Sequence, residues 1–419
     1  MYGIITIIML FMMLFMVKLI SKNRLNPYFV MSIIWSVFIC TGLIVFKNEV
    51  NWDYTGLIWI ILACLFFTTG NIIGMSITPK VILKEDKDIS ILSISWKFIL
   101  LCIILGLLRS VIEIKINGFS FNNLLSINSL LEINNSMAIQ RYSGGNINNP
   151  IMQILLIFVY AAPLCGGYAF VYSENKLHKI ISILTFIPSL MSLLITNTKA
   201  VLIASVFLWA SSFLVGYLDK YKKLPKISEI VNIKTIIILA GIFLILYTSM
   251  VLRTGKINKD IINIVNTKFK IYALGQVFSF DNWFLNNAFN TEHTLGQYTF
   301  FGIFDALGLA VRNQGVFSEF TYNLAGNGTN IYTVFRGIIS DFGILGGLIF
   351  FIVTGIFSGY SLKKISQGRK KAIISRLILT STYFFVFYSI LISPWTYNSQ
   401  ILAFIVFGFY LFLSWRKIK

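Results

Sequence analysis

Apolar runs of about twenty residues recur along the chain, separated by shorter polar segments. A helix of that length crosses the hydrocarbon core of a bilayer, which is about 30 Å thick. The pattern therefore predicts an all-α polytopic membrane protein with about eleven transmembrane helices. The predicted spans are residues 3–20, 28–46, 57–78, 91–112, 151–172, 179–196, 200–218, 234–251, 337–360, 372–392 and 400–415.

Two segments on one predicted side of the membrane are too long to be simple turns. The first loop covers residues 113–149, and the large loop covers residues 252–336, between spans eight and nine. Loops longer than about 15 residues are usually functional or disordered. The large loop is rich in Phe, Tyr and Trp, which disordered segments lack. It is therefore predicted to fold as short helices at the membrane interface, within a single membrane domain of residues 1–419.

Composition supports a membrane location and argues against nucleic acid as a partner. The chain of 419 residues is 57% hydrophobic and only 12% charged, with a mean hydropathy of +0.79. Soluble domains carry about 25% charged residues. The net charge of +19 is expected from loops that face anionic lipid. The sequence holds no nucleic-acid recognition motif.

The distribution of lysine predicts the orientation. Five basic segments all fall on one side if the N-terminus is outside and the C-terminus inside, which agrees with the positive-inside rule. The N-terminal stretch lacks a basic region and a cleavage site, so it is expected to be the first span. The location expected is the bacterial cytoplasmic membrane, with lipid as a partner. The basic segments are KLISKNR, PKVILKEDK, DKYKKLPK, LKKISQGRKK and RKIK.

The sequence gives no reason to expect a metal or another cofactor. Each of the four cysteines lies in a separate apolar run, and none belongs to a Cys/His cluster. The DKD triplet at residues 86–88 resembles the metal-binding pair of nucleotide-sugar transferases. It lies in a short charged segment on the predicted inner side, so it is interpreted as solvated surface.

Arginine does not follow the lysine pattern, because five of the nine arginines lie on the predicted outer side. The planar guanidinium suits phosphate oxygens better than an ammonium does. The hypothesis is an outer anionic ligand such as a polyprenyl diphosphate; the alternative is salt bridges to nearby acids. Arg253 is the strongest candidate because it follows span eight directly, where snorkelling to the interface is its alternative role. The five are Arg109, Arg141, Arg253, Arg312 and Arg336.

Carboxylates and aromatic residues of the same region complete a candidate site. Glu319 or Asp341 is expected to act as a base that takes a proton from a hydroxyl group. Asp341 is predicted to lie inside a membrane span, where an ionisable residue usually has a function. The alternative is a hydrogen-bonded acid with a structural role. His293 is a candidate base or sugar contact, or an ordinary surface residue. Aromatic rings beside Asn and Gln suit sugars, although they also suit a loop core.

The stretch TNIYTVFRGIISDFGILGG, which begins at Thr329, carries a family resemblance. It resembles the loop-to-helix element of bacterial O-antigen and capsule repeat-unit polymerases of the Wzy type. O-antigen ligases and peptidoglycan polymerases share a similar element. Thr329 stands where ligases carry a histidine, which favours a polymerase over a ligase. The matching positions are Asn330, Tyr332, Asp341, Gly343 and Gly346.

The resemblance implies a metal-independent glycosyltransferase that polymerises polyprenyl-diphosphate-linked oligosaccharide repeat units. A hydroxyl of one lipid-linked repeat unit would attack the growing glycan, and polyprenyl diphosphate would leave. A flippase and a chain-length regulator are the implied protein partners. Charge placement, and not the resemblance, assigns the arginines and carboxylates to this reaction, and the large loop, residues 252–336, is expected to carry catalysis. The expected roles are diphosphate binding for Arg141, Arg253 and Arg312, catalysis for Arg253 with Glu319 or Asp341, a hold on Asp341 or a phosphate for Arg336, and sugar contact for Asn330, Tyr332 and His293.

Two other classes of function stay open at this stage. A transporter, either a flippase for lipid-linked repeats or a small-solute permease, would also be polytopic. Transporters tend to carry polar sites at the membrane midplane, whereas here the unusual charges gather at the predicted outer face. A ligase that transfers finished glycan to another acceptor would share the chemistry of a polymerase.

Overall fold

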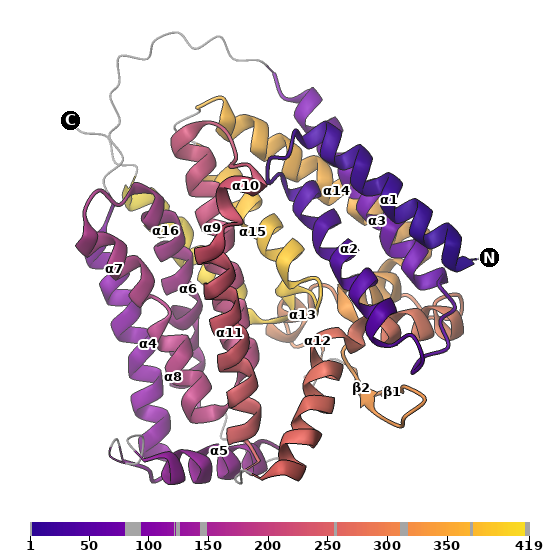
Figure 1. The fold of residues 1–419 in the computed structure, drawn as a ribbon. Coiled ribbons are helices and arrows are strands. Elements are labelled where there is room, and N and C mark those ends of the chain that lie inside the picture. Colours follow the sequence, from indigo (N-terminus) through magenta and orange to yellow (C-terminus); the bar gives the residue numbers. More distant parts are fainter. Residues whose placement is uncertain are drawn as a thin grey trace, which may run out of the picture. The chain divides into compact units, whose positions relative to one another are not determined.

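The computed structural model describes residues 2–79, 94–120, 122, 126–142, 149–254, 258–310, 317–368 and 372–414 (Figure 1). Within these ranges almost every element is a helix, and eight helical segments are long and apolar enough to cross a membrane. The predicted class is therefore confirmed: the protein is an all-α, multi-pass membrane protein. The total of eleven spans and their orientation stay predictions.

The helices follow several of the predicted spans closely. Helix α3 covers Thr55–Ile77 and α6 covers Pro150–Tyr172, each within two residues of a predicted span at both ends. The span predicted at residues 179–196 is instead two helices, α7 (Lys176–Leu184) and α8 (Ile187–Thr196). Pro188 stands in the first turn of α8, where a proline is tolerated because its missing N–H has no helical partner there.

The chain divides into two compact units. The first unit comprises residues 1–84, 221–227 and 270–401, and the second comprises 85–220, 228–269 and 402–419. The remaining elements of the first unit are α1 (Tyr2–Ser21), α2 (Pro27–Val45), α13 (Phe301–Ala306), β1 (Thr321–Tyr322), β2 (Gly328–Thr329), α14 (Thr333–Ser366), α15 (Ile373–Tyr388) and a 3-10 helix (Pro394–Thr396). Those of the second unit are α4 (Trp96–Ile116), α5 (Ile127–Tyr142) and α11 (Ile233–Leu252). Four helices cross the division, which are α9 (Lys199–Tyr221), α10 (Ile227–Ile230), α12 (Lys259–Asn287) and α16 (Asn398–Ser414).

Helices α3 and α14 form the most extensive helix pair among the described residues, because glycines line both sides of their contact. Gly70 and Gly74 on α3 meet the backbone of α14, and Gly355 and Gly359 on α14 meet the backbone of α3. A Cβ atom placed on Gly359 would lie 2.0 Å from the backbone oxygen of Asn71. Paired small-x-x-x-small patterns of this kind let membrane helices approach closely.

Helix α14 is broken at Gly343, inside the stretch that carries the family resemblance. Gly343 has φ 74° and ψ 175°, a conformation that only glycine adopts readily. The part after the break, residues 344–366, is by itself long enough to span a bilayer. The predicted span at 337–360 is therefore two helical segments, and Arg336 and Asp341 both belong to the first of them.

The large loop contains a long helix and a β-hairpin in addition to the short helices that were predicted. It contains α12, a helix of 29 residues, together with the six-residue α13 and an antiparallel hairpin of β1 and β2. The hairpin stands out from the helices of the first unit (Figure 1). Glu49, which follows α2, anchors the hairpin by accepting hydrogen bonds from Lys270 at 2.6 Å and Asn323 at 3.0 Å.

In the second unit, buried asparagines hold α5 of the first loop against the spans. The side chain of Asn134 on α5 donates to the backbone oxygen of Leu194 and accepts from Asn197, at 2.8 and 2.7 Å. Asn197 also donates to the backbone oxygen of Ser249 on α11 at 2.8 Å. These bonds satisfy the polar groups that end α8.

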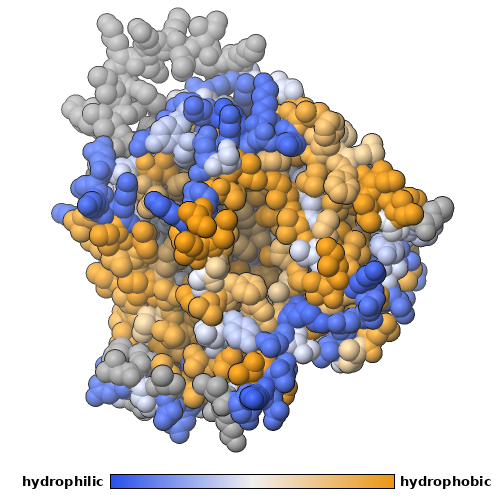
Figure 2. All heavy atoms as spheres, in the orientation of Figure 1, coloured by the Kyte–Doolittle hydropathy of each residue, from blue (hydrophilic) through white to orange (hydrophobic). Residues whose placement is uncertain are grey.

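Over α4 and α7, at the left of Figure 2, hydrophobic surface lies between hydrophilic residues above and below.

Candidate functional site

The guanidinium of Arg336 lies within a cage of aromatic rings at the start of α14. Its central carbon is 3.9 Å from the ring centroid of Phe317, 4.1 Å from that of Tyr332 and 5.2 Å from that of Trp283. Only 9% of the side chain is exposed. The negative faces of the rings stabilise the cation and replace water around it. We call Phe317, Tyr332 and Trp283 the arginine cage.

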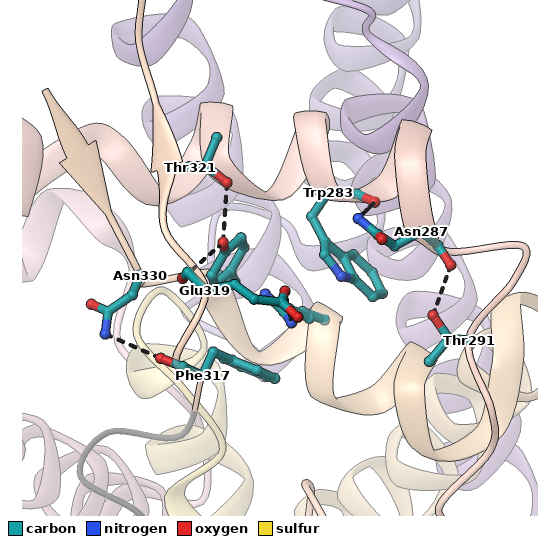
Figure 3. A network of polar contacts seen from close by, with 9 residues as sticks. Trp283, Asn287, Thr291, Phe317, Glu319, Thr321 and Asn330 are labelled. Atoms are coloured by element: carbon teal, nitrogen blue, oxygen red, sulfur yellow. Dashed lines mark hydrogen bonds and ion pairs between the residues drawn. The ribbon is translucent and has the colours of Figure 1, made fainter. Parts of the chain in front are cut away.

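Glu319 is the ionic partner of this caged arginine and is itself open to solvent. Nη2 of Arg336 donates to Oε2 of Glu319 at 2.6 Å, while 66% of the Glu319 side chain is exposed. Within the described part of the chain, the second carboxylate oxygen accepts no hydrogen bond. Figure 3 shows the Glu319 side chain between Phe317 and Trp283. One oxygen is thus fixed, and the other is free to take a proton.

Hydrogen bonds around the cage fix the segment that carries Glu319. The hydroxyl of Tyr332 donates to the backbone oxygen of Glu319 at 3.0 Å and accepts from Thr321 at 3.1 Å. The side chain of Asn330 donates to the backbone oxygen of Phe317 at 3.1 Å (Figure 3). Tyr332 is 2% exposed, so its ring faces Arg336 instead of solvent. These bonds leave little freedom to the backbone on either side of the carboxylate.

Asp341 has a different environment, because it is fully buried and accepts three hydrogen bonds. The donors are the hydroxyl of Thr294 at 2.5 Å, the backbone N–H of Tyr298 at 2.9 Å and that of Thr299 at 2.6 Å. Arg336 pairs with Glu319 and not with Asp341. Five residues along an α-helix rotate a side chain by about 140°, so the two charges leave the helix on different sides.

The end of the helical segment before Gly343 and the carboxylate of Asp341 both bind the loop of residues 294–299. Helix carbonyls just before a break lose their partners four residues ahead. Here the backbone oxygens of Ser340 and Asp341 accept from the N–H groups of Thr294 and Leu295, at 3.2 and 3.1 Å. Together with the Asp341 carboxylate, they fix residues 294–299 to the end of the first segment of α14. Asp341 is therefore well placed to position this loop.

We expect Gly343→Ala to destabilise the protein by about 1–3 kcal/mol, since alanine rarely adopts this backbone conformation. The new Cβ would also lie 2.8 Å from Nε2 of His293. Thermal unfolding of the purified protein in detergent measures the effect as a lower Tm. In the double variant with His293→Ala the clash is gone but the strain stays, so the Tm should remain low. A double variant with the Tm of the parent would show that only the clash matters.

Asp281 on α12 ties the cage to the start of α3. Its carboxylate accepts from the backbone N–H groups of Asp53 and Tyr54, each at 3.0 Å, and of Gly56 at 3.1 Å. It thereby caps the N-terminus of a helix that α12 packs against. Burial raises the pKa of the Asp281 carboxyl above its ordinary value of 3.8, and the three backbone hydrogen bonds oppose that rise. Trp283 follows two residues later on α12.

The remaining residues predicted for the site lie in several places. His293 is exposed and lies beside Gly343. Arg253 ends α11 in the second unit, one turn after Ser249, and is half-buried. Arg141 lies on α5, which packs against α11, and its side chain is not described. Arg312 lies outside the described residues. The first unit thus brings Glu319, Arg336, Asn330 and Tyr332 together, while Arg141 and Arg253 belong to neighbouring helices of the second.

Arg109, the fifth arginine of the predicted outer side, is accounted for by structural contacts. It forms a salt bridge of 3.0 Å with Glu113, one turn along α4, and donates to the hydroxyl of Ser192 on α8 at 3.0 Å. Arg109 therefore forms a salt bridge, which was the alternative to binding an anionic ligand.

The contacts of Trp283 and Phe317 with Arg336, and of Thr294 and Thr299 with Asp341, were not predicted from the sequence. Residues of the cage come from α12, from the segment before β1 and from the start of α14, so no spacing in the sequence relates them. The one feature of the sequence that could have indicated a shared site is that Phe317, Glu319 and Tyr332 lie close together along the chain.

Among the described residues, no group of three or more His, Cys, Asp and Glu side chains is arranged to hold a metal ion. Comparison of the chain with protein-family models, with curated proteins and with solved structures finds no match. The cage itself offers an exposed carboxylate, fixed by a buried arginine, next to rings and amides.

Proposed function

We propose that the protein polymerises polyprenyl-diphosphate-linked oligosaccharide repeat units into O-antigen or capsular polysaccharide at the outer face of the bacterial cytoplasmic membrane. The observation that carries the proposal is Glu319, a solvent-exposed carboxylate fixed by a caged arginine in the large loop of a multi-pass membrane protein. A lipid-linked acceptor needs such a base close to the membrane. The family resemblance of the stretch from Thr329 onward supports the same reaction.

In the proposed reaction, the free oxygen of Glu319 takes the proton of a hydroxyl group on the acceptor repeat unit. The hydroxyl oxygen forms a bond to the anomeric carbon of the growing glycan, and the bond from that carbon to the diphosphate oxygen breaks. Polyprenyl diphosphate leaves with the electron pair. The growing glycan is then attached to the acceptor, longer by one unit, and no redox partner or nucleotide sugar is consumed.

Differences in exposure and hydrogen bonding support different roles for the two candidate carboxylates. Glu319 is assigned the base, because it is exposed and has a free oxygen. Asp341 is assigned a positioning role, because it is buried and its oxygens accept three hydrogen bonds. Arg336 is enclosed, so it positions Glu319 in this proposal. Diphosphate binding stays assigned to Arg253, Arg141 and Arg312 on the sequence pattern alone.

Arg253→Ala is expected to shorten the polymer, because the variant lacks a cation for the leaving diphosphate. Removing one such electrostatic donor typically costs about 100- to 1,000-fold in rate. Arg253→Lys should restore part of the length, since lysine keeps the charge but not the planar fork. Gels of surface glycan from complemented strains measure the change. Normal polymer length in Arg253→Ala would remove this residue from the site.

A strain in which this gene is deleted tests the function itself. Surface glycan that ends after one repeat unit would support a polymerase, because flipping and attachment then survive without extension. Lipid-linked repeats retained inside would indicate a flippase instead. Full-length polymer left on its lipid carrier would indicate a ligase, and an unchanged ladder of glycan lengths would contradict all three.

A further inference from the structure

Two aromatic rings on the hairpin are exposed although the large loop has a packed interior. Phe320 is 52% exposed and Tyr322 is 63% exposed, while the rings of the arginine cage are nearly fully buried. Residues two apart on an extended segment point to the same face. Glu319 and Thr321 alternate with them and contact Arg336 and Tyr332. The segment thus presents two rings to solvent on the side opposite to its polar contacts.

A glycine on the partner strand explains how the rings lie. Gly328 pairs with Tyr322, and a Cβ placed on Gly328 would lie 2.6 Å from the ring of Tyr322 and 3.3 Å from that of Phe320. With no side chain there, both rings can rest against the partner strand. Their centroids are 6.2 Å apart and their planes differ by 28°. The outer faces of the two rings therefore form one exposed surface, which we call the ring platform.

The hairpin under the ring platform is held in place. Asn323 donates to Glu49 at 3.0 Å and accepts from the backbone N–H of Asn327 at 2.8 Å. Leu324 donates its backbone N–H to the oxygen of Glu49 at 2.8 Å, and Thr329 is buried against Gly275 of α12. A surface that is already ordered loses little conformational entropy when a ligand binds.

The charges around the ring platform favour a neutral sugar as its ligand. Residues 317–330 contain one carboxylate, Glu319, and no lysine or arginine. Phosphate and anionic lipid headgroups are attracted by basic side chains, which this hairpin lacks. Sugars instead present C–H faces to aromatic rings and hydroxyl groups to amides and carboxylates. The side chain of Asn327, beside Gly328, accepts and donates no hydrogen bond within the described residues.

We propose that Phe320 and Tyr322 bind terminal sugars of the repeat unit. Because Glu319 alternates with Phe320 along the extended segment, its carboxylate lies on the opposite face, and the proposal concerns sugar binding only. The inference rests on the proposed function and adds a sugar-binding site to it. It also moves the sugar contact away from Tyr332, whose ring is occupied by Arg336.

Binding of a lipid-free repeat unit tests this assignment separately from catalysis. The probe is a single repeat unit of the strain's own polysaccharide, released from its lipid and titrated calorimetrically into the purified full-length protein in lipid nanodiscs. Loss of an aromatic contact weakens binding by about three- to tenfold. We expect Phe320→Ala with Tyr322→Ala to raise the Kd of the repeat unit at least tenfold. Tyr322→Phe should keep the wild-type Kd.

The matched control is Phe289→Ala, which removes another exposed aromatic ring of the large loop, 76% exposed. It should leave the Kd unchanged. A wild-type Kd in the double variant would overturn the ring platform, and so would absence of binding to the wild-type protein. If the double variant shortened the polymer at an unchanged Kd, the rings would instead belong to the membrane surface. The proposed function fails by a different result, full polymer length in Glu319→Gln, which this titration does not involve.

Discussion

Glu319→Gln is expected to lower chain extension by about 100- to 10,000-fold, the range for loss of a general base. Glutamine keeps an oxygen that can accept from Nη2 of Arg336, so the cage and the backbone around it should persist. It cannot take a proton from the acceptor hydroxyl. The measurement is the rate of glycan extension by purified protein, together with the glycan ladder of a complemented deletion strain.

Two other variants make this result specific to Glu319. Glu292 is another exposed carboxylate of the large loop, and Glu292→Gln should extend glycan at the wild-type rate. Asp341→Asn should lower activity together with the Tm, because the buried carboxylate fixes residues 294–299. Glu319→Gln should lower activity while the Tm stays that of the wild type. Equal loss in Glu292→Gln, or a Tm that falls with Glu319→Gln, would count against the assignment.

Gly359→Ala is expected to destabilise the contact between α3 and α14. The new methyl group would lie 2.0 Å from the backbone oxygen of Asn71, so α3 and α14 must move apart. Overpacking of a close contact costs about 1–3 kcal/mol, and backbone atoms cannot rotate away as a side chain does. Since α14 carries Arg336 and α3 is capped by Asp281, separation of these helices should also disturb the cage.

A matched glycine separates this effect from helix propensity. Gly241 lies in α11 with no other atom within 4 Å of a Cβ placed on it. Gly241→Ala should keep or raise the Tm, because alanine favours a helix by about 1 kcal/mol over glycine. Thermal unfolding in detergent, followed by size-exclusion chromatography, measures both variants. An unchanged Tm in Gly359→Ala would mean that the two helices are not packed through their glycines.

Hydropathy alone was enough to place most helices, and it failed where glycine and proline interrupt them. The spans at α3 and α6 were predicted within two residues, because each is a continuous apolar run. The break at Gly343 was not predicted, since a glycine within an apolar run is compatible with an unbroken helix. The G-x-x-x-G spacing of GNIIG and GIFSG was visible in the sequence and was not used.

The contacts of the charged residues were predicted less completely than the helices, because they depend on tertiary structure. Salt bridges between the outer arginines and nearby acids were one of the two alternatives, but which acid pairs with Arg336 depends on how the segment before β1 folds back on α14. Arg336 was expected to hold Asp341 or a phosphate. Helix rotation places them on different sides, and the buried Asp341 binds N–H groups from a loop more than forty residues earlier. Such contacts follow from tertiary structure and not from spacing.

The most direct test of the proposed function uses the purified protein in lipid vesicles that contain only polyprenyl-diphosphate-linked repeat units. No nucleotide sugar is added, and a chelator removes divalent metals. We expect a ladder of lipid-linked glycans, with one polyprenyl diphosphate released for each linkage formed and no ladder with Glu319→Gln. Repeat units that stay single with the wild-type protein, or a ladder equally strong with Glu319→Gln, would contradict the proposed function.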